Sequence, residues 1–141
     1  MEIAQVVMDT NVLIAALRSK YGASFKLLSL VDSNHFQINL SVPLILEYED
    51  VVKRKSQQEV LQSEDIDNIL DFLCRVANLH KIFFLWRPYL KDFKDEFVLE
   101  LAITAGCDFI ITYNKKDFKG VEKFGIKVLT PKEFLEERGL L

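Results

Sequence analysis

Short apolar runs that alternate with helical patterns are the feature that most constrains the fold of this chain. Each run is short enough for a buried strand, and the segments between them carry apolar residues at helical spacing. Strands that alternate with helices form βαβ units, which build a parallel sheet covered by helices on both faces. We therefore predict an α/β fold with strands at residues 3–8, 36–40, 82–86, 109–112 and 127–129.

Helix boundaries carry recognisable capping signals. Ser41 is a candidate N-cap with Pro43 in the first turn, and Thr130 with Pro131 and Glu133 forms a capping-box pattern. Gly106 is a typical stop for the helix before it. The predicted helices span residues 11–17, 23–31, 42–55, 64–79 and 95–105, with a short helix opening at 56–59 and a C-terminal helix opening at 130–133.

The composition is that of an ordinary folded domain. Half of the 141 residues are apolar and 28% are charged, which is too apolar for a disordered chain. No repeat, low-complexity segment or linker divides the chain, so we expect a single domain over residues 1–141. No apolar run is long enough to span a membrane, and no basic leader precedes an apolar segment, so we expect neither a membrane span nor a signal peptide.

The two cysteines indicate the cellular compartment, and the net charge bears on whether the chain binds nucleic acid. Cys74 and Cys107 form no CxxC pair and lie in apolar surroundings, which predicts buried free thiols and a reducing, cytoplasmic location. The formal charge of −3 argues against a simple basic protein that coats nucleic acid. Bound divalent cations would offset that charge. The net charge of −3 therefore does not exclude a metal-dependent contact with nucleic acid.

Acidic and polar residues follow the predicted strands. Asp9 directly follows the first strand, Asn114 and Asp117 lie in the loop after the strand at 109–112, and Asp95 begins the helix that leads into that strand. Parallel sheets place ligands at the carboxyl ends of their strands. Carboxylates that converge there repel one another unless a hard cation such as Mg²⁺ neutralises them. The placement therefore predicts a metal site that can activate water for phosphodiester hydrolysis.

Each of these residues also has a purely structural interpretation. Asp9, with the following Thr10 and Asn11, can simply cap a helix. Asp92 and Asp95 lie near a helix start, where the helix dipole favours carboxylates. The loop after residue 112 can be an ordinary polar turn.

Glu47 stands out within an otherwise apolar helical turn. Its neighbours Glu49 and Asp50 have the pattern of a solvated face, and Glu47 falls on a different side of the helix. Glu96 is expected to face solvent. Glu47 is therefore a further candidate for the acidic site.

The ordered set of motifs resembles a PIN domain, specifically the group of PIN domains assigned as toxins of toxin–antitoxin systems. The first matching segment contains Asp9-Thr10-Asn11, which is common by itself, whereas the whole set in this order is specific. The resemblance covers nearly the whole chain. The matching segments are residues 7–13, 40–48, 92–102, 111–118 and 128–135.

This resemblance implies a metal-dependent ribonuclease selective for single-stranded RNA. It implies a three-layer α/β/α sandwich around a central, mainly parallel sheet of four to five strands. The acidic positions of the family match Asp9, Glu47 and Asp95, and Asp92 matches a further acidic position of the subgroup. The polar positions that line the site match Thr10, Asn11 and Ser41, together with Thr112 at the end of the fourth strand.

One position departs from the family pattern. Many PIN domains carry Asp two residues after the Thr that ends the fourth strand, whereas this chain has Asn114 there. An amide oxygen can still bind a metal or its water, but it carries no charge. Asp117 is then the candidate for the fourth carboxylate, and the number of metal ions is left open.

The mechanism that follows uses Mg²⁺ or Mn²⁺ and no protein nucleophile. Asp9 and Asp95 are expected to bind the metal directly, with Glu47 and Asp117 as ligands or water-positioning groups and Asp92 as a further ligand. The expected products have 5′-phosphate and 3′-hydroxyl ends. His35 and His80 are interpreted as structural residues at the starts of strands, away from the site.

Basic side chains around the acidic centre are candidates for RNA contacts. Residues 113–132 contain six lysines and only two acids, and phosphate contacts of this kind are independent of sequence. Tyr113 can stack on a base or serve in packing. A solvated lysine face is the alternative for each cluster. The candidates are Lys115, Lys116, Lys119, Arg54 and Tyr113, with Arg18 and Lys20 as further possibilities.

Two other classes of protein compete with the ribonuclease. A phosphoacceptor receiver domain needs an adjacent acidic pair after the first strand and a Lys after the last, and this chain has neither. A non-catalytic PIN scaffold that binds RNA or a protein partner is the second alternative, and Asn114 favours it. By resemblance alone, we also expect a homodimer and a cognate antitoxin protein.

Overall fold

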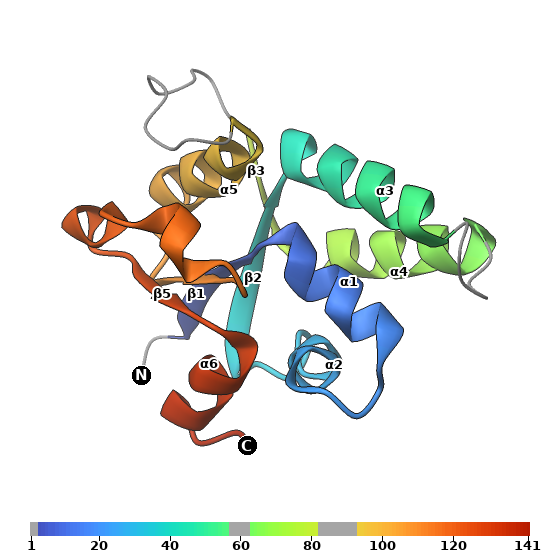
Figure 1. The fold of residues 1–141 in the computed structure, drawn as a ribbon, viewed down its shortest axis with the longest axis horizontal. Helices are drawn as coiled ribbons and strands as arrows, with labels where there is room; N and C mark the ends of the chain where they lie inside the picture. Colours follow the sequence, from blue (N-terminus) through green and yellow to red (C-terminus); the bar gives the residue numbers. More distant parts are fainter. Residues whose placement is uncertain (1–2, 57–62, 82–92) are drawn as a thin grey trace.

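A five-stranded parallel sheet forms the centre of the protein. The computed structural model describes residues 3–56, 63–81 and 93–141, and Figure 1 shows their arrangement. The strand order is β3-β2-β1-β4-β5, and each neighbouring pair is parallel. The strands are β1 (Ala4–Met8), β2 (Phe36–Ser41), β3 (Asn78–His80), β4 (Phe109–Ile111) and β5 (Lys127–Leu129).

Helices cover both faces of this sheet. The crossovers from β1 to β2 and from β2 to β3 run in one direction along the sheet, and the crossover from β3 to β4 runs back. Right-handed crossovers therefore place α1 to α4 on one face and α5 on the other. Figure 1 shows α5 and the pair α1 and α3 on opposite sides of β2. The helices are α1 (Thr10–Arg18), α2 (Ala23–Ser29), α3 (Val42–Ser56), α4 (Ser63–Val76), α5 (Phe93–Thr104) and α6 (Pro131–Glu137).

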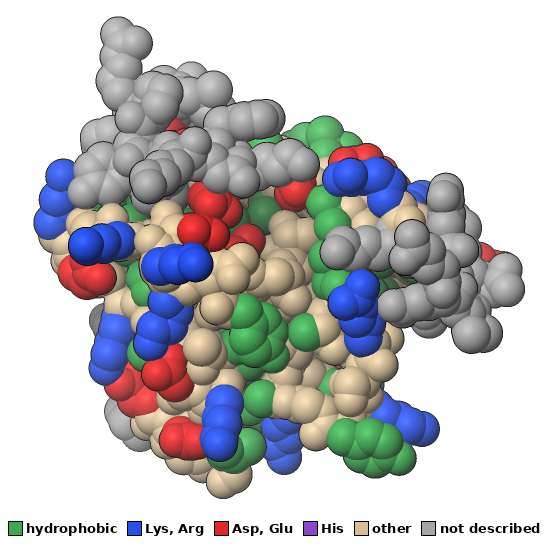
Figure 2. Space-filling view, viewed as in Figure 1, with side chains coloured by type: hydrophobic (Ala, Val, Ile, Leu, Met, Phe, Trp, Pro, Cys, Tyr) green, Lys and Arg blue, Asp and Glu red, His purple; other side chains and the backbone are tan. Residues whose placement is uncertain are grey.

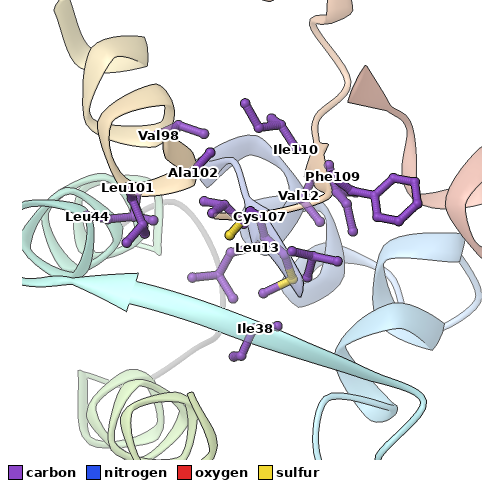
Figure 3. Close-up of a cluster of buried hydrophobic side chains, with 14 of the residues drawn as sticks. Val12, Leu13, Ile38, Leu44, Val98, Leu101, Ala102, Cys107, Phe109 and Ile110 are labelled. Atoms are coloured by element: carbon purple, nitrogen blue, oxygen red, sulfur yellow. The ribbon is translucent and has the colours of Figure 1, made fainter. Parts of the chain in front are cut away.

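The predicted three-layer α/β/α architecture is thus confirmed. Its core is the contact between the apolar central strands and the helices on either face. Strands of a parallel sheet that are buried on both faces read as continuous apolar runs, as residues 109–111 do. Figure 3 shows the side chains of this core meeting from α1, α3, α5 and the strands, including Val12, Leu13, Ile38, Leu44, Val98, Leu101, Ala102 and Ile110.

The strand register brings several polar residues to one edge. Met8 pairs with Ile111, which in turn pairs with Leu129, so β1, β4 and β5 end together. Asp9, Thr112 and Thr130 are the next residues along each strand. The carboxyl edge of the sheet is therefore where the chain turns polar.

The third strand differs from the prediction. The helix predicted over 64–79 ends at Val76, and Asn78–His80 forms the edge strand β3 beside β2. His80 is the last residue of β3 and pairs with Ser41, so the expectation that it starts a strand was wrong. Pairing with β2, together with a 2.8 Å contact between His80 Nε2 and Asn39 Oδ1, outweighs the local helical pattern. The predicted strand at 82–86 lies outside the described residues, as does most of the helix start at 56–59.

The predicted capping box and the glycine stop of α5 are confirmed, whereas the prediction of two buried thiols holds only for Cys107. The Thr130 hydroxyl accepts from the Glu133 N–H at 3.2 Å, and the Glu133 carboxylate accepts from the Thr130 N–H at 2.9 Å, which completes the capping box. Gly106 follows α5 with a φ of +64°, a value that favours glycine. Cys107 is a buried free thiol, whereas Cys74 is free but only half-buried. Within the described part of the chain, no helix is both long and apolar enough to cross a membrane.

Helix α6 provides a test of how the outer layer is attached. Phe134 is fully buried and packs edge-on against Phe36 and Phe109, with ring centroids 5.3 and 5.2 Å away. We expect Phe134→Ala to lower the free energy of unfolding by about 3–5 kcal/mol in urea titrations, because it leaves a cavity under α6. Glu136→Ala, an exposed site on the same helix, should change it by less than about 0.5 kcal/mol. Equal effects of the two variants would contradict this packing.

Candidate functional site

Asp9 is a nearly buried carboxylate at the junction of β1 and α1. Its side chain is 8% exposed, and the residue has the extended backbone of an N-cap. Its Oδ1 atom accepts from the Thr10 N–H at 2.8 Å. The structural interpretation of Asp9 as a helix cap is therefore correct, but it accounts for only one of the two carboxylate oxygens.

The second oxygen of Asp9 connects two strands. Asp9 Oδ2 accepts from the Thr112 hydroxyl at 2.8 Å, and the Asn11 amide lies 3.4 Å away. Asn11 Nδ2 also contacts the Thr112 hydroxyl at 3.3 Å, and Asn11 Oδ1 accepts from the Tyr113 N–H at 3.3 Å. These contacts hold the ends of β1 and β4 together, so the predicted site residues Thr10, Asn11 and Thr112 all gather at Asp9.

The electrostatics of Asp9 bring two further predicted residues into the site. Burial raises the pKa of Asp9 above its usual value, and the hydrogen bonds from Thr112 and Thr10 only partly oppose that rise. The negative charges of Asp117 and Glu47 raise the same pKa further. These three carboxylates therefore interact electrostatically at one edge of the sheet, although they come from β1, α3 and the loop after β4.

Glu47 is placed by the start of α3. Ser41, buried at the end of β2, accepts from the Leu44 N–H at 3.4 Å, as expected of the predicted N-cap. Glu47 is half-buried one turn later. Its neighbours behave differently, because Glu49 pairs with Lys53 at 3.2 Å and Asp50 pairs with Arg54 at 2.9 Å. Arg54, a predicted RNA contact, is thus already engaged with an acid.

Tyr48 is a site residue that the sequence analysis missed. Its side chain is fully buried, and its hydroxyl donates to the carbonyl of Met8, the residue before Asp9. Burial, and secondarily the charge of Asp9, raises the pKa of the phenol. Tyr48 is therefore a neutral hydrogen-bond donor beneath the carboxylate. The sequence does not indicate this contact, because a tyrosine within an apolar helical turn is ordinarily a packing residue.

Helix α5 brings Asp95 to its first turn, where the residue is half-buried. Asp92 lies outside the described residues. Glu96, expected to face solvent, is half-buried instead. Glu100, one turn further along, is only 2% exposed and was not singled out from the sequence. The helix therefore buries more carboxylate than its pattern of charges indicated.

The segment after β4 forms the other side of the site. It folds into a short 3-10 helix, η1 (Lys115–Phe118), which contains the exposed Asp117. The Asn114 N–H donates to the Thr112 hydroxyl at 3.0 Å, while the Asn114 side chain is exposed. Figure 2 shows acidic side chains gathered between η1 and the start of α3, with basic side chains close by.

The side chains after β4 that are predicted to contact RNA differ in whether they already pair with an acid. Lys115 Nζ pairs with Glu133 at 2.9 Å, whereas Lys116 and Lys119 are simply exposed. The Tyr113 ring is 46% exposed, and its hydroxyl lies 2.5 Å from the Ser24 hydroxyl on α2. Tyr113 therefore presents a ring whose position is held from a neighbouring helix.

The donor set suits a hard divalent cation. Within residues 3–56, 63–81 and 93–141, no three His, Cys, Asp or Glu side chains form a ready-made metal cage. Mg²⁺ needs fewer protein ligands than such a cage supplies, because it binds through one or two carboxylates and completes its shell with water and phosphate oxygens. The buried Asp9, flanked by the charges of Glu47 and Asp117, fits that requirement.

Comparisons with known proteins identify the family and the fold of the chain. The PIN domain family profile matches residues 5–116 of the chain, and the protein therefore belongs to the PIN domain family. The fold is similar to a chain in the crystal structure of VapBC2 from Rickettsia felis bound to a DNA fragment from their promoter. The TM-score is 0.58 at 16% identity, over 88% of this chain and 98% of that chain. No curated protein matches the chain by sequence.

The raised pKa of Asp9 makes a prediction about stability. The folded protein holds the Asp9 proton more tightly than the unfolded chain, whose pKa is the usual 3.8. Ionisation of Asp9 therefore costs more in the folded protein than in the unfolded chain. As the pH rises from 3.8 to above the raised pKa, the free energy of unfolding falls, and at higher pH it stays at the lower value. We expect metal-free Asp9→Asn to be more stable than the parent at pH 7 in urea titrations, because the variant has no charge to bury.

The matched control is Asp50→Asn, which removes an exposed carboxylate from α3. It should change the free energy of unfolding at pH 7 by less than about 0.5 kcal/mol. If Asp9→Asn is instead less stable than the parent at pH 7 without metal, burial of the charge is not the dominant effect at this site.

Proposed function

We propose that this PIN domain is a divalent-metal-dependent endoribonuclease that hydrolyses phosphodiester bonds of single-stranded RNA. The observation that carries the proposal is the buried Asp9, whose charge interacts with those of Glu47 and Asp117 at the carboxyl edge of a parallel sheet. Keeping like charges together in this way costs stability. A site that binds a cation and a phosphate gives that arrangement a purpose.

The residues would divide the work as follows. Asp9 and Asp95, with Asp92, would hold Mg²⁺ or Mn²⁺, and Glu47 and Asp117 would act as further ligands or orient a water. The bound cation would lower the pKa of that water and polarise the scissile phosphate. Thr10 and Thr112 keep the Asp9 carboxylate in one orientation through their hydrogen bonds. Hydrogen bonds that orient a ligand are typical of working metal sites.

RNA would approach along the basic and aromatic side chains beside this site. Lys116 and Lys119 are exposed for phosphate contacts, whereas Lys115 and Arg54 would first have to leave Glu133 and Asp50. Exposed ion pairs of this kind contribute little, so exchanging them for a phosphate costs little. Tyr113 offers a ring for base stacking, which is tolerant of sequence. Asn114 and Ser41 would line the path.

We further propose that the chain is the toxin of a toxin–antitoxin pair in the cytoplasm, with a cognate antitoxin protein and a homodimeric assembly. Support comes from the group of PIN domains that its motifs resemble and from the fold shared with a chain of VapBC2. The alternative is a PIN scaffold without catalytic activity, which the uncharged Asn114 favours. A scaffold should show no metal site that depends on Glu47 when Mn²⁺ is titrated calorimetrically.

The nuclease proposal is tested with a labelled single-stranded RNA and Mn²⁺. We expect Asp9→Asn and Glu47→Gln each to lower the cleavage rate by about 100-fold or more, and a chelator to abolish cleavage by the parent. Glu49→Gln is the matched control, because it removes a carboxylate from the same helix that pairs with Lys53 instead of interacting with Asp9.

The control should cleave at the rate of the parent. Cleavage by Asp9→Asn at that same rate would show that the activity does not arise at this site. No cleavage by the parent, together with no Mn²⁺ binding that depends on Glu47, would favour the scaffold.

A further inference from the structure

A second surface, away from the acidic residues, combines exposed rings with lysines. It lies where the connection between α1 and α2 meets α6, and it encloses an open hollow of about 520 Å³. Its side chains include Lys20, Tyr21, Phe25, Lys26 and Lys132, which together are called the aromatic–lysine surface below. Tyr21 is 90% exposed and Phe25 40% exposed. Figure 2 shows apolar and basic side chains side by side over this connection.

The charge of this surface is positive. Three lysines line the hollow, and none of the described residues that line it carries an acidic side chain. Lys132 lies near an acid on its own helix, because its Nζ atom is 3.9 Å from Glu136 Oε1, and both side chains are mostly exposed. A pair at that distance contributes little in water. The surface is therefore positive in a protein whose formal charge is −3.

Two hydrogen bonds connect this surface to the candidate site. Asp9 accepts from Thr112, and the next residue, Tyr113, reaches Ser24 on α2 through their hydroxyls. Ser24 is buried, and its two neighbours in the chain, Ala23 and Phe25, line the hollow. The exposed ring of Tyr113 thus lies between the acidic residues and the aromatic–lysine surface.

We propose that the aromatic–lysine surface binds a segment of single-stranded RNA outside the bond to be cleaved. Rings with an open face stack on bases, and lysines between them meet phosphates, which is the combination found in single-strand channels. This inference rests on the proposed function for its ligand. A protein partner fits less well, because the centres of protein interfaces are depleted in lysine and this surface has three.

Binding is tested on the full chain without metal, so that cleavage plays no part. The probe is a fluorescently labelled oligouridylate in EDTA, followed by anisotropy. We expect Tyr21→Ala to weaken binding by about fivefold or more, the effect expected from the loss of one base–aromatic stack, whereas Tyr21→Phe should bind like the parent. Folding is not at risk in either variant, because the side chain is 90% exposed.

The lysines are tested by the salt dependence of the same affinity. A variant with Lys20, Lys26 and Lys132 all replaced by Ala should lower the slope of log K against log salt by about 2, since each phosphate contact on a single strand contributes about 0.7. Lys123→Ala is the control. It lies in η2 (Val121–Phe124) just before β5, at the opposite edge of the sheet from Asp9, and should leave the slope unchanged.

The outcomes separate this inference from the proposed nuclease. If binding depends on Tyr21 while the parent cleaves no RNA, the inference stands and the nuclease proposal fails. If Tyr21→Ala binds RNA like the parent, the inference is overturned. It is also overturned if Tyr21→Ala changes only the molecular mass in sedimentation, which would make the surface a contact between copies of the chain.

Discussion

The two-sided hydrogen bonding of the Asp9 carboxylate is the interaction on which the polar edge of this protein depends. One oxygen accepts a hydrogen bond from the Thr10 N–H at the start of α1. The other accepts one from the Thr112 hydroxyl just after β4. The sheet interior is mostly apolar, with Asn39 on β2 as a buried polar exception, and Asp9 and Thr112 lie where their strands end together. A single side chain therefore contacts both the first helix and the neighbouring strand, and the charges of Glu47 and Asp117 raise its pKa.

This arrangement conflicts with stability in a way that is typical of working sites. Burial already disfavours the charged form of Asp9, and nearby like charges add to that cost. The protein tolerates it because the rest of the fold is well packed, for example where Phe134 meets Phe36 and Phe109. The proposed RNA-binding role of the aromatic–lysine surface would add to this acidic edge a second place where the same ligand is held.

Sequence reasoning succeeds here where the signal is local and fails where it depends on distant partners. The parallel sheet, the Thr130 capping box and the position of Asp9 after β1 follow from short motifs. The strand Asn78–His80 does not, because its pairing with β2 overrides a local helical pattern. The contact of Tyr48 with Met8 joins residues 40 positions apart, and burial of Glu100 depends on how α5 docks, so neither has a sequence signature. The expected metal-binding and catalytic roles of Asp9, Glu47, Asp92, Asp95 and Asp117 stay predictions, as does the part expected of Asn114.

The most direct test of the central claim is anomalous diffraction from crystals of the protein grown with Mn²⁺. We predict an anomalous difference peak beside the Asp9 carboxylate, within about 2–2.5 Å of one of its oxygens, as expected for a hard divalent cation. The same peak should be absent from crystals of the Asp9→Asn variant. A fully occupied Mn²⁺ elsewhere, with the Asp9 carboxylate still bonded only to Thr10, Asn11 and Thr112, would contradict it and leave Asp9 as a structural cap.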